Sequence, residues 1–172
     1  MQRIASVLSY VTLVLMSVLV LAAIAFLIQP EMARDILLEA APVGRMDVQP
    51  GAGTLYLLQI AGWPVLVLNL VVLWNMYALF CLYAQGDALS PSCGAHLRRI
   101  GLGLIVVPFL VMAYGAIASV LLTWENAPGA RELTLAIDSQ GLGFVIGGAL
   151  LLFVGMSMRE AAALAEENKG FV

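Results

Sequence analysis

The residues best suited to chemistry in this sequence lie in one short stretch that contains Cys93 and His96. A thiolate and an imidazole at this spacing are a common pair of zinc ligands, and Cys81 could supply a third. A structural zinc site needs four ligands, and the sequence has no second Cys-x-x-Cys or His-x-x-x-His set. No nucleophile or acid stands beside His96 to make it a general base, whereas redox sensing by Cys93 stays open. We therefore expect no metal, no cofactor and no enzymatic reaction.

The composition places these residues in a membrane protein. Of the 172 residues, 62% are hydrophobic and 11% are charged, and the mean hydropathy is +0.99. A typical soluble domain is about half apolar and about a quarter charged, so this chain cannot cover its apolar side chains with a polar surface. The balance excludes an ordinary soluble enzyme and a disordered chain. A net charge of −3 argues against direct nucleic-acid binding, so the first partner to expect is the lipid bilayer.

Four stretches are long and apolar enough to cross that bilayer. A spanning helix needs roughly 20 mainly apolar residues. The stretches cover about residues 4–28, 55–83, 100–124 and 141–158, and none has a charged residue or a histidine in its interior. The first resembles a signal peptide, but its apolar run is longer than a signal core of about 7–15 residues, so we expect it to be retained. The predicted fold class is all-α, an integral membrane four-helix bundle, with residues 1–172 forming a single transmembrane domain.

Basic residues in the short connections predict the orientation of the bundle. Five lie in the N-terminus, the 85–99 loop and the 159–172 tail, against three in the 29–54 and 125–140 loops. The five are Arg3, Arg98, Arg99, Arg159 and Lys169, and the three are Arg34, Arg45 and Arg131. We therefore predict a multi-pass protein with both termini, the 85–99 loop and the 159–172 tail in the cytoplasm.

Small residues on the fourth span predict how it packs. Gly141, Gly148 and Gly155 are spaced by seven and share one face of a helix, whereas Gly143 and Gly147 form a G-x-x-x-G pair on roughly the opposite face. Membrane helices associate through close packing, so small residues on two faces predict a helix wedged between two neighbours. Packing within the chain is the simpler interpretation. A face for homo-oligomer formation is the alternative.

Two amides lie inside the second span. Asn69 is near mid-membrane and Asn75 is nearer the cytoplasmic side. An amide in hydrocarbon is costly without a partner, so we predict interhelical hydrogen bonds worth about 1 kcal/mol each. A ligand or proton path is the alternative, but their spacing turns the two side chains about 120° apart around the helix.

The connections supply candidate interaction surfaces. Residues 31–39 predict a short amphipathic helix, which is either an external sensing surface or a cap over the bundle. Ser90 followed by Pro91 predicts the start of a helix that runs into the third span, with a basic pair at headgroup depth. Alanine and glutamate in the tail predict that the fourth helix continues past the membrane. The candidate partner-binding residues are Arg98, Arg99, Glu166, Glu167, Asn168, Phe171 and Val172.

Two segments also resemble a known family. They are Gly86-x-x-Leu89-Ser90-Pro91 with His96-Leu97-Arg98-Arg99-Ile100-Gly101, and Ala163-Leu164-Ala165-Glu166-Glu167-Asn168 with Phe171-Val172. With the span number and loop lengths, they resemble the small four-span bacterial membrane proteins catalogued as domain of unknown function 2975. The resemblance implies a bacterial inner membrane location. Because genes of that family often neighbour a small helix-turn-helix regulator, it also implies a cytoplasmic regulator as partner.

Three functions stay open at this point. A non-enzymatic sensor or regulatory protein, acting through cytoplasmic interactions, fits the motifs that gather on one side of the membrane. An accessory or structural subunit of a larger membrane complex fits the small-residue faces of the fourth span. A transporter-like protein that binds a lipid or small molecule is the third. The lack of acids, bases and histidine within the spans argues against ion coupling, so we expect the first.

Overall fold

The computed structural model describes residues 2–29, 31, 34–39, 51–87, 90–124, 133, 135 and 139–169. Within these ranges the chain is helical and contains no strand, which confirms the predicted all-α fold class. The helices are α1 (Gln2–Ile28), α2 (Arg34–Glu39), α3 (Ala52–Gln85), α4 (Pro91–Thr123) and α5 (Ser139–Lys169). All but α2 are long and apolar enough to cross a membrane, so the chain is built as a multi-pass membrane protein.

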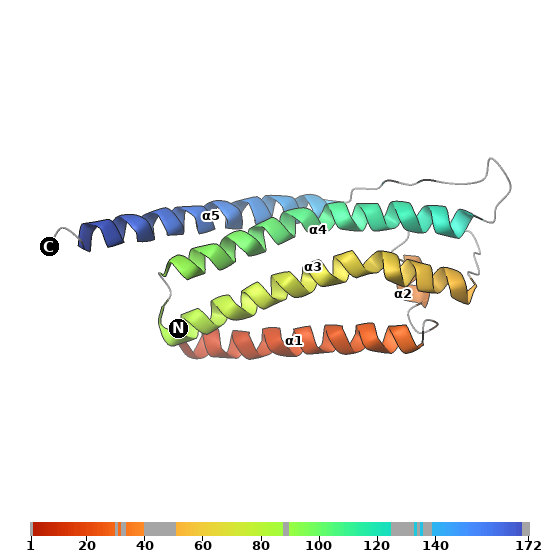
Figure 1. Cartoon of the computed structure of the whole chain (residues 1–172), viewed down its shortest axis with the longest axis horizontal. Helices are drawn as coiled ribbons and strands as arrows, with labels where there is room; N and C mark the ends of the chain where they lie inside the picture. Colours follow the sequence, from red (N-terminus) through yellow and green to blue (C-terminus); the bar gives the residue numbers. More distant parts are fainter. Residues whose placement is uncertain are drawn as a thin grey trace.

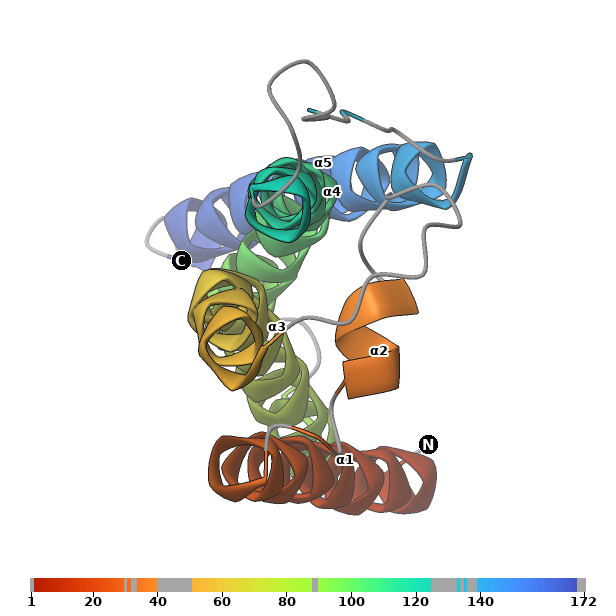
Figure 2. The ribbon, with the colours of Figure 1, turned by 90° about the vertical axis from the view of Figure 1, so that its right-hand side faces the viewer.

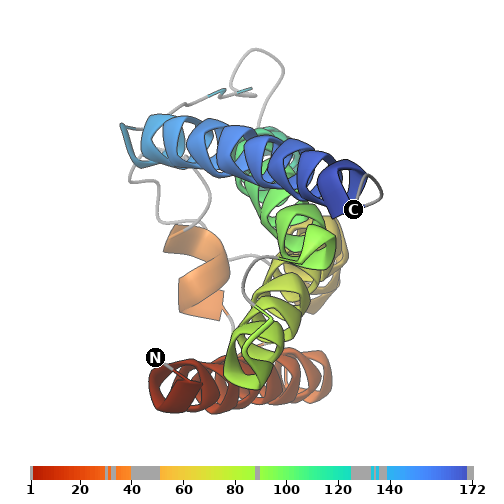
Figure 3. The ribbon, with the colours of Figure 1, turned by 90° about the vertical axis from the view of Figure 1, so that its left-hand side faces the viewer.

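The four long helices form an open bundle in which each packs on the next. The contacts run from α1 to α3, from α3 to α4 and from α4 to α5, with no other contact between long helices in the described ranges. α1 begins and α5 ends at the same end of the bundle, which we call the N/C end (Figure 1). Viewed along its length, the row curves into a trough with α1 and α5 at its edges and α2 on its open side (Figures 2 and 3).

Local signals explain where the helices begin and end. α3 ends at Gly86, whose φ of 87° is left-handed and whose backbone N–H reaches the carbonyls of the last helical turn. Glycine suits this position because it has no Cβ to clash there. α4 begins at Pro91 after Ser90, as predicted, because proline needs no backbone donor in the first turn. The prediction that the fourth helix continues into the tail is also confirmed, since α5 runs to Lys169.

Glycines bring the backbones of α4 and α5 into direct contact. A Cβ placed on Gly148 would lie 2.7 Å from the carbonyl oxygen of Gly101, and one on Gly155 would lie 2.7 Å from that of Gly94. Gly141, seven residues before Gly148 on the same face of α5, is also buried. Small residues let the two backbones approach closely, and the helices gain van der Waals contacts that larger side chains would prevent. The predicted packing face of the fourth span is therefore the α4 contact.

The opposite face of α5 has no neighbour among the described residues. A Cβ placed on Gly143 or Gly147 would meet no atom within 4 Å. Of the other described helices, only α4 contacts α5. The prediction that the fourth helix is wedged between two neighbours is therefore wrong for the described part of this chain. The physical reason is that the row of helices ends at α5, so one of its two small-residue faces is left uncovered.

Candidate functional site

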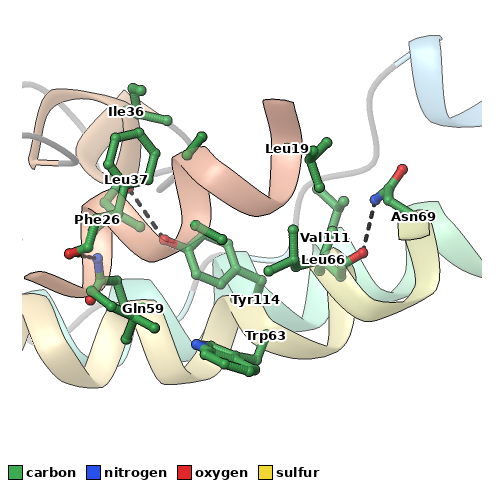
Figure 4. Close-up of a pocket in the computed structure, with 15 residues that line it drawn as sticks. Leu19, Phe26, Ile36, Leu37, Gln59, Trp63, Leu66, Asn69, Val111 and Tyr114 are labelled. Atoms are coloured by element: carbon green, nitrogen blue, oxygen red, sulfur yellow. Dashed lines mark hydrogen bonds between the residues drawn. The ribbon is translucent and has the colours of Figure 1, made fainter. Parts of the chain in front are cut away.

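The concave side of the helix row contains an apolar hollow of about 400 Å³. It lies in the half of the bundle away from the N/C end, among side chains of α1, α2, α3 and α4 (Figure 4). Apolar groups such as Phe26, Leu37 and Trp63 make up most of its lining. Ligand sites in proteins are mostly apolar concavities of about 300–1,000 Å³ with a few polar groups that fix orientation. This hollow has that size and character.

The open packing of the helices explains why a hollow forms here. α1 and α4 each contact α3 but do not contact each other. A gap therefore remains between α1 and α4, and side chains fill it only in part. On α3 the hollow is lined by Gly62, which contributes no side chain to fill it. A Cβ placed there would lie 3.7 Å from Cε2 of Tyr114, so the ring of Tyr114 forms the wall opposite. Small residues on α1, Ala22 and Ala23, leave further room.

Gln59 on α3 is the most unusual polar group of the hollow. Its Nε2 donates a hydrogen bond to the carbonyl of Phe26, near the end of α1. The helical donor for that carbonyl would be residue 30, which is a proline and has no backbone N–H. Gln59 therefore satisfies an acceptor that the sequence of α1 leaves open, and this fixes its amide orientation. Its Oε1 is buried and has no hydrogen-bond partner among the described residues.

Tyr114 on α4 and the short helix α2 border the hollow on the concave side of the helix row. The Tyr114 hydroxyl donates to the carbonyl of Leu37 across 3.5 Å, a long hydrogen bond. The Leu37 side chain packs on the hydrophobic cluster that contains Leu58 and Tyr114. The amphipathic helix predicted over residues 31–39 is thus present as α2, over Arg34–Glu39. Its contacts favour a cap over the bundle rather than a helix lying free on the membrane.

The two amides predicted to join helices behave differently. Nδ2 of Asn69 donates to the carbonyl of Val65 on its own helix, 2.8 Å away, and Asn69 lines the hollow. The predicted interhelical bond of Asn69 is therefore wrong within the described chain, because its own helix satisfies the donor. Asn75 is buried, donates to Val71 on its own helix, and places Oδ1 2.9 Å from Nδ1 of His96. Asn75 thus joins α3 to α4, as predicted.

This difference leads to a prediction about stability. Asn75→Ala leaves Nδ1 of His96 without its partner and should destabilise the bundle by about 1 kcal/mol. Asn69→Ala, the matched control, removes only a bond within α3 and should cost clearly less. Unfolding of the purified variants in mixed micelles, followed by circular dichroism against added sodium dodecyl sulfate, measures both. Equal losses, or a larger loss for Asn69→Ala, would contradict the interhelical role of Asn75.

The pair of Cys93 and His96 does not form one cluster. Cys93 is buried, and its Sγ lies 3.2 Å from the carbonyl oxygen of Asp87 and 3.5 Å from Oγ of Ser90. His96 instead hydrogen-bonds to Asn75. No group of three or more His, Cys, Asp or Glu side chains that could hold a metal occurs in the described ranges. Cys93, in the first turn of α4, therefore contacts Asp87 and Ser90, which precede the helix.

The described candidate partner-binding residues lie at the N/C end. Arg98 and Arg99 are exposed on α4, where they border a second hollow together with Arg159 of α5. The backbones of Glu166, Glu167 and Asn168 belong to the last turns of α5, but their side chains lie outside the described set. Phe171 and Val172 lie outside the described residues altogether. The structure thus groups the arginines, and the predicted contacts of the tail stay predictions.

Several residues that shape the two hollows or the contact between α4 and α5 were not predicted from the sequence. They are Gln59, Gly62, Tyr114, Arg159 as a partner of the basic pair, and Gly94 with Gly101 on α4. One signal was available, since Gly94 and Gly101 repeat the seven-residue spacing of Gly148 and Gly155. The other residues are ordinary in sequence and gain meaning only from packing. No family model, curated protein or solved structure matches this chain. The role of the site therefore has to be argued from its geometry.

Proposed function

We propose that the protein is a non-enzymatic membrane sensor that binds an apolar molecule in the hollow and acts on a cytoplasmic partner. The observation that carries the proposal is the hollow of about 400 Å³, which α1, α2, α3 and α4 line. Because side chains of α1, α2, α3 and α4 line the hollow, its shape depends on the relative positions of these helices. The proposal assigns no reaction to the chain.

The lining indicates the chemistry of the ligand. Phe26, Leu37 and Trp63 favour a hydrocarbon body. Oε1 of Gln59 is buried and has no hydrogen-bond partner among the described residues, which costs about 1–3 kcal/mol and favours a hydrogen-bond donor on that body. A long-chain alcohol combines these properties. We therefore propose an amphiphile with a single small donor group rather than a charged head.

The helix contacts provide a route from the hollow to the N/C end. Gln59 ties α3 to α1, and Tyr114 ties α4 to α2, so an occupant that favours one spacing of these helices shifts their arrangement. α4 carries this shift along its length, and its glycine contact with Gly148 and Gly155 passes it to α5. The 85–99 loop and the 159–172 tail then change position together. The excess of basic residues at this end supports a cytoplasmic location, and a bacterial inner membrane is part of the proposal.

The proposed partner is a small helix-turn-helix regulator, which rests on the family resemblance alone. The candidate contacts on the tail are Glu166, Glu167, Asn168, Phe171 and Val172. Removing residues 159–172 should abolish this interaction and leave binding in the hollow intact, because no described residue of the tail lines the hollow. A tail deletion that left every partner interaction and transcript level unchanged would contradict the regulatory part of the proposal.

The test is purification of the tagged protein at native level from its own membranes in mild detergent. Organic extraction and mass spectrometry should find an uncharged amphiphile retained at close to one molecule per chain. A co-purifying soluble DNA-binding protein supports the regulator. A preparation that retains only the bulk phospholipids, in their membrane proportions, contradicts ligand binding in the hollow.

A second candidate function is an accessory subunit of a larger membrane complex. The uncovered face of α5 favours it, because Gly143 and Gly147 offer a close-packing surface that no described residue of this chain uses. Co-purification of unrelated membrane proteins, lost when Gly143→Leu and Gly147→Leu are combined, supports this alternative. Retention of those proteins by the double variant, or a strictly monomeric protein, counts against it.

A further inference from the structure

The N/C end contains a second hollow, of about 590 Å³, between α4 and α5. Three arginines border it, Arg98 and Arg99 from α4 and Arg159 from α5. The first turn of α4 lies beside them with Ser92, and Leu102 forms the apolar wall toward the middle of the bundle. The hollow is therefore cationic at one end and apolar at the other.

The glycine contact explains why the arginines converge. A Cβ placed on Gly94 would lie 2.8 Å from Cγ of Arg159, so the aliphatic stem of Arg159 lies directly against the backbone of α4. On the other helix, a Cβ placed on Gly155 would lie 2.7 Å from the backbone nitrogen of Arg98. The same close packing that joins the two helices thus forces their cationic residues together.

No acidic side chain that the structure describes borders this cluster. None of Arg98, Arg99 and Arg159 forms an ion pair with another described residue. Glu160, the residue after Arg159, is exposed and does not border the hollow. The first turn of α4 adds partial positive charge, because its backbone N–H groups lack helical acceptors. An anion bound in the hollow would offset this repulsion.

The position of the arginines along the helices indicates which anion is at hand. Arg98 and Arg99 directly precede the apolar stretch of α4, and Arg159 directly follows that of α5. All three therefore lie where an apolar span meets the headgroup layer. Basic hollows between helices at this depth bind anionic lipid headgroups, and the planar guanidinium matches two phosphate oxygens at once.

We propose that the hollow bordered by Arg98, Arg99 and Arg159 binds the phosphate of an anionic phospholipid, with an acyl chain along Leu102. This site is separate from the apolar hollow between α1 and α4 and does not depend on ligand binding there. It also assigns the three arginines to a lipid, which leaves the rest of the tail, residues 160–172, as the surface for a protein partner. The bound lipid would act as a bridge between α4 and α5.

The test measures lipid retention by native mass spectrometry. The purified protein is equilibrated with phosphatidylglycerol and then partly delipidated, and the same is done with phosphatidylcholine. We expect preferential retention of phosphatidylglycerol, reduced about tenfold when Arg98→Gln and Arg159→Gln are combined. The matched control, Arg3→Gln with Arg34→Gln, removes the same charge from α1 and α2 and should retain the lipid fully. Equal retention by the two double variants overturns the proposal.

Three further measurements distinguish a lipid site from a free-phosphate site and from a protein-binding surface. Arg98→Lys with Arg159→Lys preserves the charge and, if the Gln variant fails to elute as a single species, carries the test. Its retention should fall between those of the native protein and the lipid-free background, because lysine lacks the bidentate fork. Displacement of the lipid by millimolar glycerol phosphate would identify a free-phosphate site and overturn the proposal. Loss of a co-purifying acidic protein with unchanged lipid retention would identify a protein surface and also overturn it.

Discussion

Gly148→Val is expected to disrupt the contact between α4 and α5 and to cost about 3 kcal/mol of stability, at the upper end for overpacking. A Cβ on Gly148 would lie 2.7 Å from the carbonyl oxygen of Gly101 and 3.0 Å from the backbone nitrogen of Ile105. Backbone atoms cannot rotate away as the end of a side chain can. The helices must therefore separate, and the dispersion contacts along their glycine faces are lost.

The neighbouring glycine provides the control. Gly147→Val makes the same chemical change one position earlier, on a face where a Cβ would meet no atom within 4 Å. We expect its midpoint for unfolding by sodium dodecyl sulfate to match that of the native protein. Equal destabilisation by the two substitutions, or a larger effect at Gly147, would mean that α5 packs through its other face. That result would contradict the contact between α4 and α5 on which the arginine hollow depends.

Gly62→Leu is expected to abolish ligand binding in the apolar hollow while leaving the fold intact. Gly62 lines the hollow, and the extra side-chain atoms would occupy space that the ligand needs. The first of these atoms would lie 3.7 Å from Cε2 of Tyr114, an ordinary contact, so the wall itself need not move. Leucine also favours helix over glycine by about 0.8 kcal/mol, so lost binding would not reflect unfolding. We expect at least a tenfold loss of the retained amphiphile.

Two substitutions control for this change. Gly62→Ala adds only the tolerated Cβ and should retain most of the binding. Gly143→Leu adds the same leucine on the open face of α5 and should leave binding unchanged. Mass spectrometry of extracts from equal amounts of each folded variant measures the effect. Full retention of the amphiphile by Gly62→Leu would place its binding site outside the hollow.

Local physical signals in the sequence were enough to predict the helices. Apolar runs without internal charge marked the spans, and the pair of Ser90 and Pro91 marked the start of α4. Alanine-rich sequence marked the helical tail, which α5 follows to Lys169. The seven-residue spacing of Gly148 and Gly155 marked a real contact face. Each of these signals acts within a few turns of one helix, which is why it can be recognised without the fold.

The arrangement of the helices and the hollow could not be predicted in this way. Small residues at Gly143 and Gly147 show that a neighbour could approach, but not whether one is present. Gln59 gains its role from a carbonyl on another helix, 33 positions away in sequence. That carbonyl has no helical donor because proline occupies position 30. The hydrogen bond between Gln59 and this carbonyl can therefore be recognised only once α1 and α3 are known to lie side by side. Asn69 and Asn75 likewise differ only in what lies across from them.

The central claim is that the hollow binds an amphiphile, and tryptophan fluorescence can test it directly. Trp63 lines the hollow, whereas Trp124 follows the last residue of α4, does not line the hollow and is 59% exposed. Two single-tryptophan proteins, each retaining one of these residues with phenylalanine at the other tryptophan positions, are titrated in detergent with a long-chain alcohol brominated near its tail. Bromine quenches tryptophan only at contact, so a bound quencher and one dissolved in the micelle give different curves.

We predict that Trp63 is quenched with saturation at about one quencher per chain, and that Gly62→Leu removes this saturable component. Trp124 should show only the gradual quenching that follows partition into the micelle. The same gradual curve at both tryptophans, unchanged by Gly62→Leu, would contradict the claim that the hollow is a binding site.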